Sequence, residues 1–265
     1  MTIGSLFEGR NAIIFAATGA IARAVAAELG RQRAKLFLSA RDRHRLDALV
    51  DRLVRESGAN VDAALVNAED QAEVDDYLKA LAHRGVHPEL VFNGIGVDPA
   101  DAQYGERSET VVLESFVAPL ARIVGSQFLT ATRAAGRMAA SRPGVIALLS
   151  SSLARSAIPH MAGITAASDA VEGLARVLAA EYAPRGIRVA CVRLDAIPET
   201  RTILMSMAAN AKTLGVSVEQ FAASISYGKR SARVLTLADA SRAIVHVLSD
   251  GGTALSSLPV DIAFP

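Results

Sequence analysis

The sequence has little cysteine, no tryptophan and almost no net charge. Its single cysteine, Cys191, excludes an internal disulfide and a zinc site built from several cysteines. Because Cys191 lies in the apolar run "IRVACVRL", we expect a buried, inert thiol. A net charge of +1 offers no electrostatic attraction to nucleic acid or to an anionic membrane. The five histidines show no spacing typical of metal ligands, so no metal site is predicted.

Long hydrophobic segments are also missing. No uninterrupted apolar run approaches the ~20 residues that a helix needs to cross a bilayer. The N-terminal stretch "MTIGSLFEGRNA" lacks the basic start and the apolar segment of a signal peptide. We therefore expect a cytoplasmic protein that binds a small molecule and neither a membrane nor nucleic acid.

The residues that are present form a regular alternation of short β-rich runs and longer helical ones. Strands are predicted at residues 11–17, 34–40, 61–67, 89–94, 144–150, 187–194 and 258–263. Helices are predicted near residues 20–30, 42–56, 69–83, 111–141, 164–183, 203–224 and 237–249. Several of the strands are apolar on both faces, as strands covered by helices on each side are. The pattern predicts one α/β domain with a doubly wound parallel sheet of about seven strands.

The first predicted strand leads into "AATGAIARAVAAELG", residues 16–30, which outlines a turn that could hold a dinucleotide. Such a turn needs small residues, so that the backbone can approach the pyrophosphate and the helix can pack on the strand. Here Gly19 is the only glycine between Ala16 and Ala22. Alanine preserves close packing but disfavours positive φ, so Ala16 is the position where cofactor approach is in doubt.

Other strand ends carry candidate groups, because ligands of such sheets bind beyond the carboxyl ends of the strands. Arg41 follows the second strand, where an acidic residue would bind a ribose 2′-hydroxyl and an arginine suits a 2′-phosphate; a solvated basic loop is the alternative. Asn93 and Gly94 follow the fourth strand. Serines 150–152 follow the fifth.

The order of these pieces resembles the short-chain dehydrogenases/reductases. They are the small-residue turn, "SAR" at 39–41, "NGIG" at 93–96, "LSS" at 149–151 and above all "EGLARVLAAEYAPRGIRV" at 172–189. The resemblance implies a single Rossmann-type domain over residues 1–265, with about 203–230 as a substrate lid. It also implies a homodimer or homotetramer that pairs through the helices near 111–141 and 164–183. The implied cofactor is NADP(H) rather than NAD(H). The implied cofactor-binding residues are Ala16, Gly19, Ala20, Ile21, Arg41, Asn67, Asn93, Gly94 and Thr200.

The sequence departs from this family at the positions of the family's catalytic residues. The resemblance assigns the catalytic serine to Ser151, whereas the tyrosine position holds Ile164 and the lysine position holds Ser168. Isoleucine has no proton to give, and loss of a positioned acid or base typically costs about 10²–10⁴ in rate. The family's proline-glycine pair after the sixth strand is Leu194-Asp195 here. We therefore expect that the standard Tyr/Lys carbonyl reduction does not run.

Three hypotheses follow from the departure. The first is an atypical oxidoreductase that keeps NADP(H) and takes its proton from His160, Tyr104, the substrate or water. The second is a pseudoenzyme or partner subunit without redox activity. The third is a non-redox catalyst that uses the same cleft. The sequence leaves open whether the chain is an enzyme, and it does not name a substrate.

Overall fold

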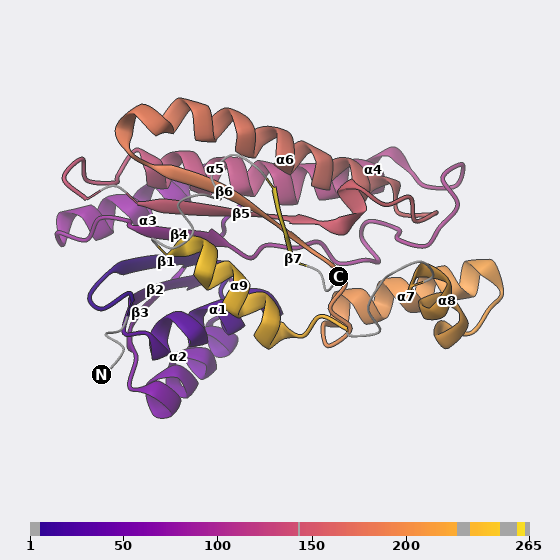
Figure 1. Ribbon diagram of the computed structural model, residues 1–265, viewed down its shortest axis with the longest axis horizontal. Helices are drawn as coiled ribbons and strands as arrows, with labels where there is room; N and C mark the ends of the chain where they lie inside the picture. Colours follow the sequence, from indigo (N-terminus) through magenta and orange to yellow (C-terminus); the bar gives the residue numbers. More distant parts are fainter. Residues whose placement is uncertain (1–5, 143, 227–233, 250–258, 263–265) are drawn as a thin grey trace.

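The sheet of this protein has seven parallel strands in the order β3-β2-β1-β4-β5-β6-β7 (Figure 1). It is seen in a computed structural model that describes residues 6–142, 144–226, 234–249 and 259–262. The strands are β1 (Asn11–Phe15), β2 (Lys35–Ala40), β3 (Asn60–Leu65), β4 (Leu90–Asn93), β5 (Val145–Ser151), β6 (Arg188–Leu194) and β7 (Pro259–Ile262). The strand order reverses between β1 and β4, and this is the point where doubly wound sheets bind ligands.

Helices cover both faces of the sheet. On one face lie α1 (Ala20–Arg31), α2 (Arg43–Ser57) and α9 (Leu237–Leu248), and on the other lie α3 (Gln71–His83), α4 (Leu113–Pro119), α5 (Ser126–Ala135) and α6 (Ala162–Tyr182) (Figure 1). Strand β1 shows why both faces are apolar. Ala12 and Ile14 pack into the core on the α1 side, while Ile13 and Phe15 pack on the α6 side, and all four are fully buried. The predicted α/β fold is confirmed.

Two further helices, α7 (Arg201–Leu214) and α8 (Val218–Ser226), project at one end of the molecule after β6 (Figure 1). The sequence predicts one helix over 203–224, which is wrong. Gly215 has a left-handed backbone (φ 67°) that ends α7, as glycine often does at a helix C-terminus. The predicted lid over 203–230 therefore contains two helices as far as residue 226, and its residues 227–230 lie outside the described part. Residues 258 and 263 of the last predicted strand also lie outside it.

The predicted helix over 111–141 is three segments. Pro119 ends α4, since proline has no N–H to donate, and a π-helical segment, Leu120–Gly125, separates α4 from α5. Helix α5 then ends at Ala135 instead of continuing to 141. The π-helical segment matters for the site because it carries Ile123 into the cavity described below.

The single cysteine behaves as the sequence predicts. Cys191 is fully buried in β6, and burial, followed by the nearby Glu172 charge, raises the pKa of its thiol to about 12. In the part of the chain that the structure describes, no helix is long and apolar enough to cross a bilayer.

Candidate active site

The turn between β1 and α1 keeps a conformation that suits glycine although an alanine occupies it. Ala16 has φ of +51°, in the left-handed region that costs an L-residue about 1–2 kcal/mol. Two hydrogen bonds hold the turn: the Gly19 amide donates to the Ala16 carbonyl oxygen (3.0 Å), and the Ala17 amide donates to that of Ser39 (2.8 Å). These backbone hydrogen bonds thus hold Ala16 in the left-handed conformation that an alanine disfavours.

A glycine on the neighbouring strand end compensates for the alanine in α1. A Cβ added at Gly94 would lie 2.5 Å from the Ala22 Cβ, which real Cβ atoms do not approach. The methyl group of Ala22 therefore occupies the space that Gly94 leaves open. Helix and strand still pack closely, so the N-terminus of α1 remains beside the carboxyl ends of β1 and β4.

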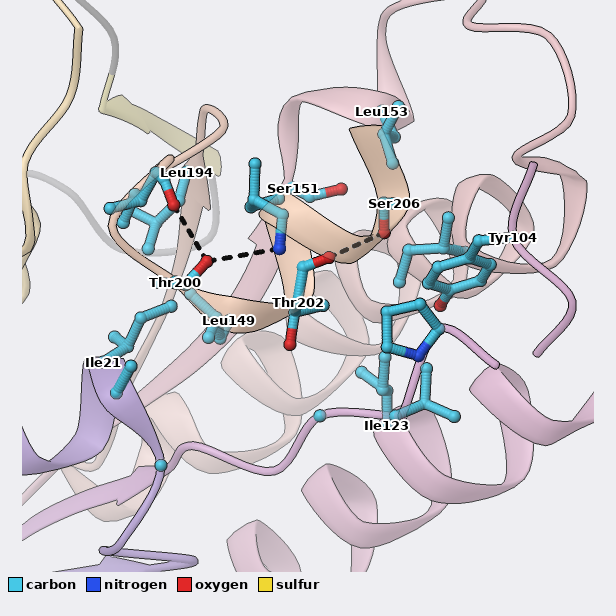
Figure 2. A pocket seen from close by; sticks show the side chains of 18 of the residues that line it. Ile21, Tyr104, Ile123, Leu149, Ser151, Leu153, Leu194, Thr200, Thr202 and Ser206 are labelled. Carbon is cyan, nitrogen blue, oxygen red and sulfur yellow. Dashed lines mark hydrogen bonds between the residues drawn. The ribbon is translucent and has the colours of Figure 1, made fainter. Parts of the chain in front are cut away.

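A cavity of about 410 Å³ opens at this edge of the sheet. It is walled by the start of α1, the loop after β4, the end of β5, the start of α6 and the segment from β6 into α7 (Figure 2). Most of the wall is apolar. Its residues include Gly19, Ala20, Ile21, Gly94, Tyr104, Ile123, Leu149, Ser150, Ser151, Leu153, Met161, Ile164, Ser168, Leu194, Asp195, Thr200, Thr202, Ile203 and Ser206. The cavity brings together Ser151, Ile164 and Ser168 from distant parts of the sequence.

These three residues form a short hydrogen-bonded chain. The Oγ atoms of Ser151 and Ser168 lie 2.8 Å apart, and Ser168 Oγ also donates to the Ile164 carbonyl oxygen at 2.8 Å. Residues 164 and 168 are one turn apart on α6, so both face the cavity. The chain of hydroxyls therefore ends at a backbone carbonyl, and no ionisable group stands in it.

A second cavity of about 820 Å³ adjoins the first. It lies between the loop after β5 and the helices α7 and α8, and Asn210, Leu214 and Phe221 line its far side. Ser151, Leu153, Met161, Ile203 and Ser206 line both cavities. Ser151 thus stands at their junction.

Comparison with known proteins places this site in a family. The family model described as enoyl-(acyl carrier protein) reductase, a branch of the short-chain dehydrogenases/reductases, matches residues 16–257, which is most of the chain. The protein is a short-chain dehydrogenase/reductase. This confirms the family that the sequence motifs resemble.

Relatives of this short-chain dehydrogenase/reductase include a Streptomyces violaceoruber protein named "Granaticin polyketide synthase putative ketoacyl reductase 1", 28% identical over 183 residues. That match covers 68% of this chain and 65% of the relative, so it spans less than two thirds of the relative's length. Similar solved structures are levodione reductase (TM-score 0.84, 23% identity, 97% and 96% of the two chains) and a variant actinorhodin polyketide ketoreductase with NADPH (TM-score 0.85, 19% identity, 96% of each chain). At these identities, the structural likeness shows the fold.

The family motif predicts cofactor contacts after β2 and β3, and the structure places Arg41 and Asn67 outside the cavity walls. Arg41 is exposed, and its guanidinium lies 3.3 Å from a Glu69 carboxylate oxygen. Arg45, from the start of α2, donates to the Thr18 carbonyl oxygen of the turn at 3.3 Å. Asn67 accepts from the Glu69 amide through Oδ1 (3.2 Å), so its side chain shapes its own loop.

The side chain of Asn93 makes three hydrogen bonds within the protein. Its amide nitrogen donates to the hydroxyls of Ser126 and Thr130, at 3.2 and 3.1 Å, and its Oδ1 accepts from the Ile95 amide at 2.9 Å. It is buried in the short-chain dehydrogenase/reductase core. Asn93 therefore holds the loop that carries Gly94, and both of its side-chain N–H groups donate within the protein.

Thr200, a cofactor contact predicted from the family motif, lies on the cavity wall at the start of α7. Its hydroxyl donates to the Ile197 carbonyl oxygen (2.8 Å) and accepts from the Ile203 amide (3.4 Å), so it caps the helix (Figure 2). At the mouth of the cavity, the Arg201 guanidinium lies 3.7 Å from an Asp98 carboxylate oxygen.

The two substitute proton donors predicted from the sequence are placed differently. Tyr104 lines the cavity (Figure 2), but its hydroxyl is buried without a hydrogen-bond partner among the described residues, and burial raises the pKa of Tyr104 well above its usual value. His160 is absent from the walls of both cavities. Its carbonyl oxygen accepts from the Gly105 amide, and its backbone has a positive φ of 63°.

A buried ion pair behind the serines was not predicted from the sequence. Arg193 on β6 makes two 2.7 Å contacts to the carboxylate of Glu172 on α6, which is 1% exposed. Burial alone would raise the pKa of Glu172, but the hydrogen bonds from Arg193 and the charges of Arg193 and Arg155 lower it. Ser150 Oγ bonds to the same carboxylate at 3.2 Å. A charged residue inside the apolar run "IRVACVRL" was the available signal.

Gln127 on α5 is a second missed residue. Its side chain accepts from the Leu149 amide (2.6 Å) and donates to the Leu149 carbonyl oxygen (3.0 Å). Strand β4 pairs with β5 only as far as Ala147, so Gln127 satisfies the backbone of β5 beyond that point. It therefore holds the strand end that presents Ser150 and Ser151.

Proposed function

We propose that this protein binds a nicotinamide dinucleotide, NADP(H) in preference to NAD(H), and that it does not run the Tyr/Lys carbonyl reduction of its family. One observation carries the proposal. A single cavity extends from the turn residues Gly19, Ala20 and Ile21 to Ser151, Ile164 and Ser168. The turn that would bind a dinucleotide and the positions that lack the family's catalytic tyrosine and lysine therefore line the same cavity.

The residues at the turn fit such a cofactor. Ala16 keeps the left-handed backbone that a dinucleotide turn uses, and the free amides at the start of α1 suit a pyrophosphate. Family position further assigns cofactor contacts to Arg41, Asn67, Gly94 and Thr200. Asn93 supports the Gly94 loop from behind. A bound nicotinamide would supply a hydride donor or acceptor.

The preference for NADP(H) rests on the arginine after β2. Arg41 is in the position where an arginine accommodates a 2′-phosphate, and its contact with Glu69 is a surface ion pair of at most about 1 kcal/mol. A 2′-phosphate can therefore draw Arg41 away from Glu69 at small cost. Arg45 stands on the same side of the turn and adds positive charge there.

The side chains at the reaction end do not supply a proton. Ile164 has no ionisable group, and Ser168 replaces the positive charge that would lower the pKa of a neighbouring acid. Ser151 is hydrogen-bonded to Ser168, and an unassisted serine is a weak acid. The Tyr104 hydroxyl is enclosed by protein, and its raised pKa makes it a poorer proton donor still.

The test is calorimetric titration of the wild-type protein with NADPH and NADH, repeated on Arg41→Ala. We expect NADPH to bind more tightly than NADH, and Arg41→Ala to weaken NADPH about tenfold while NADH changes little. An Arg43→Ala variant is the matched control, because Arg43 pairs with Asp47 on the exposed face of α2. Absence of NADPH binding to the wild-type protein would contradict the proposal.

The second candidate function is a pseudoenzyme that acts through pairing of subunits. Exposed apolar side chains on α4, α5 and α6 favour it: Leu113 (69% exposed), Phe128 (52%) and Val177 (62%). We propose that these helices mediate a homodimer or homotetramer. Light scattering on Phe128→Glu and Val177→Glu should show dissociation, whereas Leu204→Glu on α7, equally exposed at 53%, should not. A wild-type monomer would contradict this candidate.

A further inference from the structure

The second cavity has a polar side and an apolar side. The polar side is the segment after β5, where Ser152, Arg155 and Ser156 contribute to the wall. The apolar side is formed by α7 and α8, through Ile203, Met207, Leu214 and Phe221. A ligand that matches both sides has an apolar body and a polar group at one end.

Arg155 is held at the polar side by the backbone around it. Its amide donates to the Ser152 carbonyl oxygen at 2.9 Å, and the Ser156 hydroxyl donates to the same oxygen at 3.0 Å. The side chain of Arg155 is 62% exposed. Arg155 therefore stands where the cavity wall meets solvent, and an anion bound to it can keep part of its hydration.

The protein uses only part of the hydrogen-bonding capacity of Arg155. Its carboxylate partner, Glu172, already receives two hydrogen bonds of 2.7 Å from Arg193. The bond from Arg155 to Glu172 is longer, 3.2 Å, and it is the one hydrogen bond that the Arg155 guanidinium makes among the described residues. A guanidinium has five N–H groups, so most of them are left for a ligand or water. If Arg155 turned toward a ligand, Glu172 would keep its pair with Arg193.

Asp195 is the other charged residue on the described wall of the second cavity. Its Oδ1 accepts from the Ser152 hydroxyl at 3.0 Å and from the Ala196 amide at 2.8 Å. The Asp195 carboxylate repels an anion from its part of the wall, whereas Arg155 attracts one. An anionic end of a ligand is therefore directed to Arg155.

We propose that the second cavity binds an apolar carboxylic acid, with the ligand carboxylate paired with the Arg155 guanidinium and the carbon skeleton lying against α7 and α8. The planar fork of an arginine can donate two parallel hydrogen bonds to a carboxylate. Burial of the skeleton against the apolar side adds affinity in proportion to the area that is removed from water. The inference goes beyond the proposed function, because neither nucleotide binding nor a reaction step enters it.

The test uses matched probes, 4-phenylbutanoate and 4-phenylbutanamide, which have similar size and differ in charge. Their dissociation constants are measured by calorimetry on the wild-type protein, with and without NADPH. We expect the acid to bind about tenfold more tightly than the amide, because hydrogen bonds between charged groups are the stronger ones. Phenylacetate, which is two methylenes shorter, should bind about tenfold more weakly than 4-phenylbutanoate. Equal binding of acid and amide, or no binding of the acid, would overturn the proposal.

Variants of Arg155 test where the carboxylate lies. Arg155→Gln should weaken the acid about tenfold and change the amide less than twofold. Arg155→Lys keeps the charge but not the fork, so it should weaken the acid only about threefold. Thermal unfolding checks that both variants are folded, which we expect because Glu172 keeps Arg193.

Arg201→Gln is the matched control. Arg201 is also exposed, but it lines the first cavity and not the second. This variant loses the same charge and should change the binding of both probes less than twofold. If Arg201→Gln weakens the acid and Arg155→Gln does not, the carboxylate lies at the first cavity and the proposal is wrong.

The proposed function and this inference can fail separately. If NADPH does not bind but the acid binds in a way that depends on Arg155, the cofactor proposal is wrong and the carboxylate site stands. If NADPH binds and the acid shows no preference over the amide, the carboxylate site is wrong and the cofactor proposal stands.

Discussion

The β1–α1 turn and the start of α6 have both lost the residues typical of their family, with different consequences. At the turn, Ala16 adopts the left-handed backbone, and Gly94 leaves room for Ala22. On α6, Ile164 and Ser168 lie on the cavity wall, but they cannot supply a phenol or an ammonium. A binding turn formed by the backbone tolerates a change of side chain if its conformation is kept. A proton transfer that depends on an ionisable side chain is lost with that side chain.

Restoring the missing tyrosine and lysine should have the largest effect on activity. We expect Ile164→Tyr with Ser168→Lys to raise the NADPH-dependent reduction of a bicyclic ketone, such as 1-tetralone, by about 10²–10⁴, the usual contribution of a positioned acid or base. The measurement is NADPH consumption followed by absorbance. Ile164→Phe with Ser168→Met is the control, because it fills the same space without a proton donor or a charge. If both double variants are equally inactive while NADPH is bound, the cleft has diverged beyond these two side chains.

The next effect concerns the support behind the serines. Arg193→Met should destabilise the protein by about 3–5 kcal/mol, because it leaves Glu172 buried with only Arg155 as a cationic partner. Urea unfolding measures the loss. The combined variant Arg193→Met and Glu172→Met should recover most of the stability. Recovery would be absent if the arginine acted through packing alone.

The same ion pair predicts a pH dependence. The pKa of Glu172 is lowered in the folded protein, so its stabilisation is present above the unfolded pKa, near 4.5, and is lost as the pH falls through the folded value. The wild-type protein should lose stability in that acidic range. The loss attributable to Glu172 should be missing from the double Met variant when both proteins are unfolded in urea across pH 3–7.

A smaller effect tests the compensation at the turn. Gly94→Ala should destabilise the protein by about 1–3 kcal/mol, since the new methyl group would overlap the Ala22 Cβ. Adding Ala22→Gly should restore stability, which thermal unfolding can measure. Failure of the second change to rescue the first would mean that the clash lies elsewhere.

The smallest effect tests the strained alanine. Ala16→Gly should stabilise the protein by about 0.5–1 kcal/mol, because glycine relieves the positive φ but loses more backbone entropy on folding. Ala27→Gly, in the middle of α1, should instead destabilise by about 0.5–1 kcal/mol. If the two variants change the free energy of unfolding in the same direction, Ala16 is not strained.

Local patterns in the sequence were enough to predict the fold. Strands apolar on both faces alternate with amphipathic helices, and each pattern depends on residues that are near one another in the chain. The same local information identified the turn at Ala16 and the unusual residues at 164 and 168. Helix ends were less well predicted, because the break at Gly215 and the π-helical segment after Pro119 depend on capping and packing.

Only the tertiary structure decided what these residues do together. The conformation of Ala16 is imposed by hydrogen bonds that reach Ser39, and the space for Ala22 comes from Gly94 in the loop after β4. Likewise, Ser151 at the end of β5 is hydrogen-bonded to Ser168 on α6, and the pKa of Glu172 is lowered because Arg193 reaches it from β6. These contacts join residues far apart in the chain, so the periodicity of a single segment cannot specify them.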